Sequence, residues 1–110
     1  MKAIKYGYFG EDDAIRLFLH HYLKAVALGT PWYFELDEPF SHRYQATNKK
    51  QVDSLFAEAC QVGLSDYQQD CFFVGRDLDD FSSSALRQKR AAMHEAVSRW
   101  ATKAILLVPV

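Results

Sequence analysis

The stretch Cys71-Phe72-Phe73-Val74-Gly75-Arg76-Asp77-Leu78-Asp79 joins an uninterrupted apolar run to a pair of aspartates. An apolar run without alternation, here residues 71–75, is typical of a β-strand that is buried on both faces, as in a parallel sheet covered by helices. Because alternate residues of an extended chain face the same side, Asp77 and Asp79 are expected to present both carboxylates to one space.

Further strands and helices are predicted on either side of this run from β-branched and aromatic enrichment and from helical spacing. The other strands are Lys2–Phe9, Trp32–Leu36 and Ala104–Val108. The first helix follows Asp13 and stops at Gly29, the second runs from its cap Asn48 to Gly63, and the third runs from its cap Ser84 to Trp100. Residues 37–47 are predicted to form a loop.

The predicted core residues recur at three- and four-residue spacing along each helix. They are Ile15, Phe18, Tyr22 and Val26, widened by Leu19 and Leu23, in the first helix; Val52, Leu55, Phe56, Ala59 and Cys60 in the second; and Leu86, Met93, Val97 and Trp100 in the third. The order β-α-β-α-β-α-β predicts the α/β class: one three-layer domain over residues 1–110, with a mainly parallel four-stranded sheet and helices on both faces.

Composition narrows the classes of protein to which this chain belongs. The 110 residues carry a formal net charge of −1, which excludes nucleic-acid binding through bulk positive charge but not through a local basic patch. No apolar run approaches the roughly 20 residues that cross a bilayer, and the first residues turn acidic too early for a secretory signal. The two cysteines, Cys60 and Cys71, are predicted to be buried thiols. We therefore expect no membrane contact and a reducing cytoplasm.

Acidic residues follow two separate strands. Glu11 comes directly after the first strand, and Asp77 and Asp79 follow the third. Ligands of open α/β sheets bind outside the carboxyl ends of the strands, so these side chains converge if the two strands are neighbours. Three carboxylates in one crevice repel one another unless a divalent cation neutralises them, and Mg²⁺ is the expected ion. Asp12 and Asp13, in contrast, are predicted to stabilise the start of the first helix.

This arrangement resembles the TOPRIM domain, most closely that of OLD-type nucleases and small bacterial defence proteins. The matching stretches are the Gly10-Glu11 turn after the first strand and the Arg76-Asp77-Leu78-Asp79 motif after the third. The resemblance implies Mg²⁺-dependent cleavage of phosphodiester bonds in phage defence or DNA processing. It also implies that Glu11, Asp77 and Asp79 are both catalytic residues and metal ligands, with Mn²⁺ as a substitute ion.

The sequence departs from the family pattern at two points. Asp12 stands where the family usually has glycine, and the chain ends at Val110, where related nucleases carry further helices. The chain is accordingly expected to be either a minimal protein or a piece of a larger one.

A nuclease also needs cations to hold its substrate, DNA in preference to RNA. Arg76 lies beside the aspartates, and Arg87 and Lys89 lie near the start of the third helix. His42, in the predicted loop, is a further candidate for a substrate contact on the same rim as Glu11.

Two other functions are compatible with the same fold. A catalytically degenerate TOPRIM-like module would act through a protein partner, in a homo-oligomer or a larger defence complex; the first helix is apolar over more than one face, with Leu17, Phe18 and Leu19 in sequence. A receiver-like phosphoacceptor also uses acids after its first and third strands, but it needs a lysine after its last strand.

Overall fold

The computed structural model describes residues 2–76, 83–98 and 104–107, in which helices and parallel strands alternate. In chain order the elements are β1 Lys2–Gly10, α1 Asp13–Ala27, β2 Trp32–Leu36, α2 Glu38–Arg43, α3 Lys49–Ser65, β3 Cys71–Gly75, α4 Ser83–Ala96 and β4 Ala104–Leu107. The predicted α/β class with a parallel sheet is confirmed.

The sheet has the strand order β2-β1-β3-β4, and every neighbouring pair is parallel. β1 is long enough to pair with a different strand along each half of its length. Its first half pairs with β2, up to the match between Tyr6 and Leu36, and its second half pairs with β3, beginning at the match between Tyr6 and Cys71. β2 therefore ends at the level where β3 begins.

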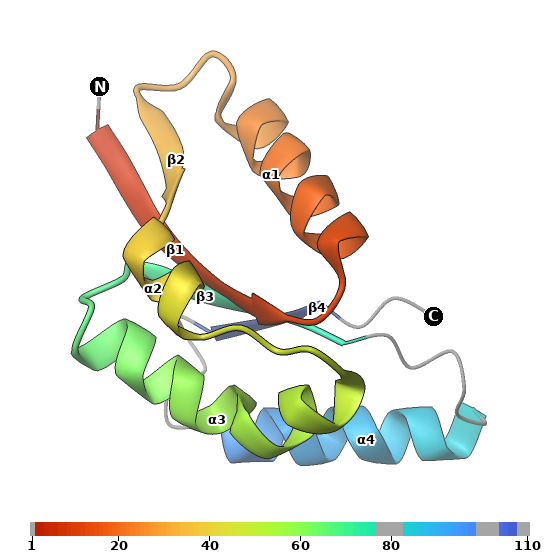
Figure 1. The fold of residues 1–110 in the computed structure, drawn as a ribbon. Coiled ribbons are helices and arrows are strands. Elements are labelled where there is room, and N and C mark those ends of the chain that lie inside the picture. The colour runs from red at the N-terminus through yellow and green to blue at the C-terminus, as the bar shows by residue number, and fades with distance from the viewer. Residues whose placement is uncertain (1, 77–82, 99–103, 108–110) are drawn as a thin grey trace.

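Helices cover both faces of the sheet (Figure 1). On one face, Leu19 and Leu23 of α1 pack against Tyr6, Tyr8 and Phe73. On the other face, α2, α3 and α4 enclose the larger core, whose members outside the sheet include Phe40, Val52, Phe56, Ala59, Cys60, Met93 and Val97. Phe72 and Val74 of β3 face this second core while Phe73 faces the first, so the strand is buried on both faces as predicted.

The buried face of α1 differs from the predicted one. Leu19 and Leu23 are buried, whereas Phe18, Tyr22 and Val26 are 65%, 48% and 55% exposed. Both rows repeat every four residues and both are apolar, so spacing alone did not decide which row meets the sheet. In the structure, the row that contains Leu19 and Leu23 packs against the sheet.

The predicted loop at 37–47 was wrong over part of its length, because Glu38–Arg43 forms α2. The Asp37 carboxylate accepts a hydrogen bond from the Phe40 N–H at 3.2 Å, which caps the helix, and Pro39 lies in its first turn. Phe40 is fully buried and packs edge-on against Phe72 of β3. This buried ring anchors α2 beside the sheet.

The limits of the longer helices follow the predictions only in part, and the predicted cap Ser84 lies inside α4, which begins at Ser83. Asn48 caps α3 by accepting from the Gln51 N–H at 2.9 Å, as predicted. α3 continues past Gly63 to Ser65, because that glycine faces the buried Gln69 side chain and is not the end of the helix. Met93 of α4 and Val97, the residue after that helix, are buried as predicted; the Leu86 side chain and Trp100 lie outside the described part of the chain.

Within the described residues, no helix has the length and apolar character that a membrane span requires. Cys60 is buried and Cys71 is half-buried, and both are free thiols. Burial raises the pKa of each thiol to about 11.

Candidate functional site

The carboxyl ends of β1 and β3 lie side by side. Gly10 is matched with Gly75 in the sheet register, and Glu11 and Arg76 are the next residues on the two strands. The chain leaves β1 to the β2 side and later returns to the β3 side, so this is the point where the strand order reverses. Ligands of open parallel sheets bind at such a point.

The turn that follows β1 is held in place by contacts with Tyr8. The Tyr8 hydroxyl donates to the Asp12 carbonyl oxygen at 3.2 Å, and burial, aided by the neighbouring carboxylates, raises the pKa of Tyr8. A Cβ at Gly10 would lie 2.5 Å from the Tyr8 hydroxyl and 2.9 Å from the Gly75 carbonyl oxygen, so no larger residue fits there. These contacts fix where the chain presents Glu11.

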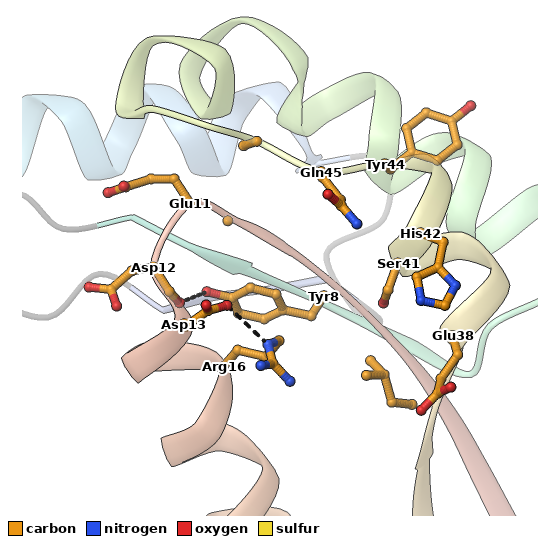
Figure 2. Close-up of a pocket in the computed structure, with 13 residues that line it drawn as sticks. Tyr8, Glu11, Asp12, Asp13, Arg16, Glu38, Ser41, His42, Tyr44 and Gln45 are labelled. Atoms are coloured by element: carbon orange, nitrogen blue, oxygen red, sulfur yellow. Dashed lines mark hydrogen bonds and ion pairs between the residues drawn. The ribbon is translucent and has the colours of Figure 1, made fainter.

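The acids of this turn have different roles. Asp12 caps α1, accepting from the Ala14 N–H at 2.7 Å, and Asp13 lies 3.4 Å from Nε of Arg16. Both roles agree with the sequence prediction. For the Glu11 carboxylate, no hydrogen bond or ion pair is found among the described residues. In Figure 2 it points away from Arg16 and His42.

Asp77 and Asp79 lie outside the described residues, so their predicted positions beside Glu11 stay a prediction. Within the described ranges, no group of three His, Cys, Asp or Glu side chains is arranged to hold a metal ion. Glu11 offers the hard carboxylate oxygen that Mg²⁺ prefers.

Two of the three predicted substrate cations are bound to an acid that sequence reasoning missed. Arg76 is 4% exposed, and it donates from Nε to Asp53 Oδ1 at 2.9 Å and from its terminal guanidinium nitrogen to Oδ2 at 3.2 Å. Nζ of Lys89 lies 3.1 Å from the same Oδ2. Arg87 is exposed on α4. Arg76 and Lys89 therefore join β3 and α4 to Asp53 of α3.

The charge on Asp53 is stabilised by these partners. Its partial burial favours the neutral acid, but the hydrogen bonds from Arg76 and Lys89 outweigh that effect and hold the pKa of Asp53 below its usual value. The bidentate pair with Arg76 is the strongest geometry available to a guanidinium and a carboxylate. It fixes the residue that immediately precedes Asp77.

A cavity of about 500 Å³ opens between the β1–α1 turn and α2. Figure 2 shows Arg16 on one side of it, Ser41 and His42 on the other, and Gln45 pointing inward above Tyr8. Glu11 lines the same cavity, so the expectation that His42 shares a rim with Glu11 is confirmed.

The cavity exists because β2 is short. The Tyr6 carbonyl accepts from the Asp37 N–H at 2.9 Å, and among the described residues no later backbone bond is found on this side of β1. Since backbone groups of a strand alternate in direction, the N–H and C=O of Tyr8 point to the same side, beyond the end of β2. Sequence reasoning missed this cavity because no local signal in the sequence sets how far β2 extends along β1.

Comparisons with protein-family models, with characterised proteins and with solved structures found no match.

Proposed function

We propose that the protein is a TOPRIM-like, Mg²⁺-dependent nuclease that cleaves phosphodiester bonds, in DNA rather than RNA, during phage defence or DNA processing. The observation that carries the proposal is the register that matches Gly10 with Gly75. It supports a site in which Glu11 and the aspartates after β3 share one crevice. The four strands in the order β2-β1-β3-β4, with helices on both faces, are compatible with a TOPRIM-like topology.

In this proposal Glu11, Asp77 and Asp79 hold Mg²⁺, which would supply Lewis-acid stabilisation of the charge that develops on the scissile phosphate. Glu11 either completes the ligand set or accepts the proton of the attacking water. Arg87, exposed on α4, attracts the phosphate backbone. Arg76 contributes by fixing the end of β3 through Asp53, since its guanidinium is buried.

The direct test is cleavage of single- and double-stranded DNA and of RNA with Mg²⁺ or Mn²⁺. We expect Glu11→Gln and Asp77→Ala to lower the cleavage rate by at least about 100-fold, because each removes a group that acts on the reacting atoms. Glu58→Gln is the matched control, since Glu58 is an exposed glutamate on α3. EDTA should abolish cleavage by the wild-type protein.

Calorimetric titration with Mg²⁺ provides a second readout that does not depend on finding the substrate. The wild-type protein should bind the ion and Glu11→Gln should bind it more weakly. The proposal fails if the intact protein binds no divalent cation, or if Glu11→Gln cleaves as fast as Glu58→Gln.

The exposed apolar side of α1 favours a second candidate, a TOPRIM-like module that acts by binding protein. Phe18 and Tyr22 are stacked with their ring centroids 6.0 Å apart, and Val26 and Leu28 continue the apolar surface. This function needs no metal. A folded protein that associates through α1 and is indifferent to Mg²⁺ would favour the module over the nuclease.

A further inference from the structure

The cavity between the β1–α1 turn and α2 contains polar groups that the fold leaves unsatisfied. The Ser41 hydroxyl oxygen is buried and has no hydrogen-bond partner within the described residues. The backbone N–H and C=O of Tyr8 point beyond the end of β2, where no strand continues. Buried polar groups are nearly always hydrogen-bonded, so the Ser41 hydroxyl, beside the backbone edge of Tyr8, favours a polar ligand in this cavity.

The other residues that line the cavity favour a ligand that carries hydrogen-bond donors and acceptors along one edge. Gln45 points its amide into the cavity, and His42 stands beside Ser41 (Figure 2). An amide, a hydroxyl, an imidazole and a backbone N–H and C=O each offer complementary donors or acceptors. Apolar walls come from the Tyr8 ring, Leu36 and Ala46. This mixture suits a flat heterocycle with polar edges.

The charges around the cavity restrict the ligand further. Glu11, Asp12, Asp13 and Glu38 line it, against the guanidinium of Arg16, which is already paired with Asp13. An isolated phosphate is repelled by this excess of carboxylates. A neutral heterocycle is not, and an attached phosphate becomes acceptable when a divalent cation lies at Glu11.

We propose that this cavity binds the base of one unpaired nucleotide of the substrate, next to the phosphate that is held at Glu11. The inference rests on the proposed nuclease function and specifies where its substrate is recognised. A volume of about 500 Å³ is within the range of small-ligand sites, roughly 300–1,000 Å³, and accommodates a base with its sugar. Recognition of unpaired bases through their polar edges is the usual way in which proteins read single strands. Ser41 and Gln45 are the specificity residues.

The test uses neutral nucleosides as probes: deoxyadenosine, deoxyguanosine, deoxycytidine and thymidine. Each is titrated into the whole protein in EDTA while backbone amide shifts are followed by NMR. We expect shifts at Tyr8, Ser41 and Gln45 with at least one nucleoside, and a loss of affinity of about tenfold in Ser41→Ala and in Gln45→Ala. Ser54→Ala is the matched control, because Ser54 is exposed on α3 and bonds its own helix.

Two further readouts separate recognition from structure. Ser41→Ala should not lower the melting temperature, since it removes an unsatisfied hydroxyl, so any loss of binding is not a loss of folding. The 5′-monophosphate of the preferred nucleoside should bind more weakly than the nucleoside in EDTA, and more tightly after Mg²⁺ is added.

The proposal is overturned if no nucleoside shifts these amides at roughly 10 mM, or if Ser41→Ala and Gln45→Ala bind as Ser54→Ala does. Asp77→Ala keeps the two proposals apart, because it should stop cleavage without changing any of the described residues that line the cavity. Metal-dependent cleavage without nucleoside binding would reject the base site alone. Nucleoside binding without metal binding would reject the nuclease alone and retain a base-binding cavity.

Discussion

Asp53 connects three segments that are distant in sequence. Its two carboxylate oxygens accept from Arg76 at the end of β3 and from Lys89 of α4. Removing one partner of a buried ion pair costs more than the pair itself contributes, because the remaining charge stays desolvated. Arg76 is the buried partner here, so Asp53 matters mainly because it neutralises that guanidinium.

We predict that Asp53→Asn lowers the free energy of unfolding by about 2 kcal/mol at pH 7. Urea unfolding measures the change, and Asp66→Asn is the control, since Asp66 is an exposed acid at the end of the same helix. A change no larger than that of the control would show that the Arg76 pair contributes nothing to stability.

The same variant has a pH signature. The pKa of Asp53 is lower in the folded protein than its unfolded value of about 3.9, so the unfolded chain binds the proton more readily. The stability that Asp53 contributes is therefore complete above about pH 4 and is lost as the pH falls through the lower folded value. The difference between wild type and Asp53→Asn should shrink in that acidic range.

Local side-chain roles were predictable and distant ones were not. The capping role of Asp12 follows from its position just before a helical pattern, and the structure confirms it. The Asp53–Arg76 pair depends on how α3 crosses β3, and the two residues are 23 positions apart. No local pattern marks such a partner.

At the scale of secondary-structure elements, Gln69 connects β1, α3 and the start of α2. Its side chain is buried between Gly7 of β1 and Gly63 of α3, and its Nε2 donates to Asp37 Oδ2 at 2.9 Å. Asp37 in turn caps α2. The position of α2, and with it one wall of the cavity, therefore depends on close contact between a strand and a helix at two glycines.

We predict that Gly63→Ala destabilises the protein by about 1–2 kcal/mol, although alanine is the better helix former. The reason is steric: a Cβ at Gly63 would collide with the Gln69 amide and lie 3.1 Å from Cδ2 of Phe72. Thermal unfolding measures the cost. The double variant Gly63→Ala/Gln69→Ala should cost less than the sum of the single changes, and strict additivity would refute the contact.

Sequence patterns predicted the existence of the long elements better than their orientation. The strands, the Asn48 cap and the buried residues of α3 other than Leu55 agree with the prediction. The predicted buried face of α1 was right for Leu19 and Leu23 and wrong for Phe18, Tyr22 and Val26, because two apolar rows compete and only contact with the sheet chooses between them. α2 was missed because Pro39 was taken as a loop signal, although proline is equally typical of a first helical turn.

At the scale of the whole molecule, the outer row of α1 exposes large apolar side chains. Phe18, Tyr22 and Val26 lie along it, and Leu28 and Trp32 extend it toward β2. Contiguous exposed apolar surface on a small domain commonly marks a protein contact.

We predict that the protein self-associates through this row. Light scattering after gel filtration should show a mass that rises with protein concentration, and Phe18→Ser/Tyr22→Ser should remain a monomer with an unchanged melting temperature. Leu55→Ser is the control, because Leu55 is a partly exposed apolar residue on α3. A monomer at every concentration in the wild-type protein would contradict this prediction.

The two parts of the candidate site differ in how far the sequence predicts them. The meeting of Glu11 with the end of β3 follows from the position of acids after parallel strands, and the register between Gly10 and Gly75 agrees with it. The cavity depends on the length of β2 relative to β1, which is a property of the assembled sheet.

The pairing of β1 with β2 over one half and with β3 over the other has a consequence for how the protein can evolve. The end of β1, which presents Glu11, is positioned by its pairing with β3. The shape of the cavity depends instead on where β2 ends and on α2. Under the proposed function, substitutions within residues 37–46 would alter which ligand is recognised while the edge around Glu11 keeps its geometry. Descendants of such a nuclease would then be free to diverge in specificity while inheriting the same chemistry.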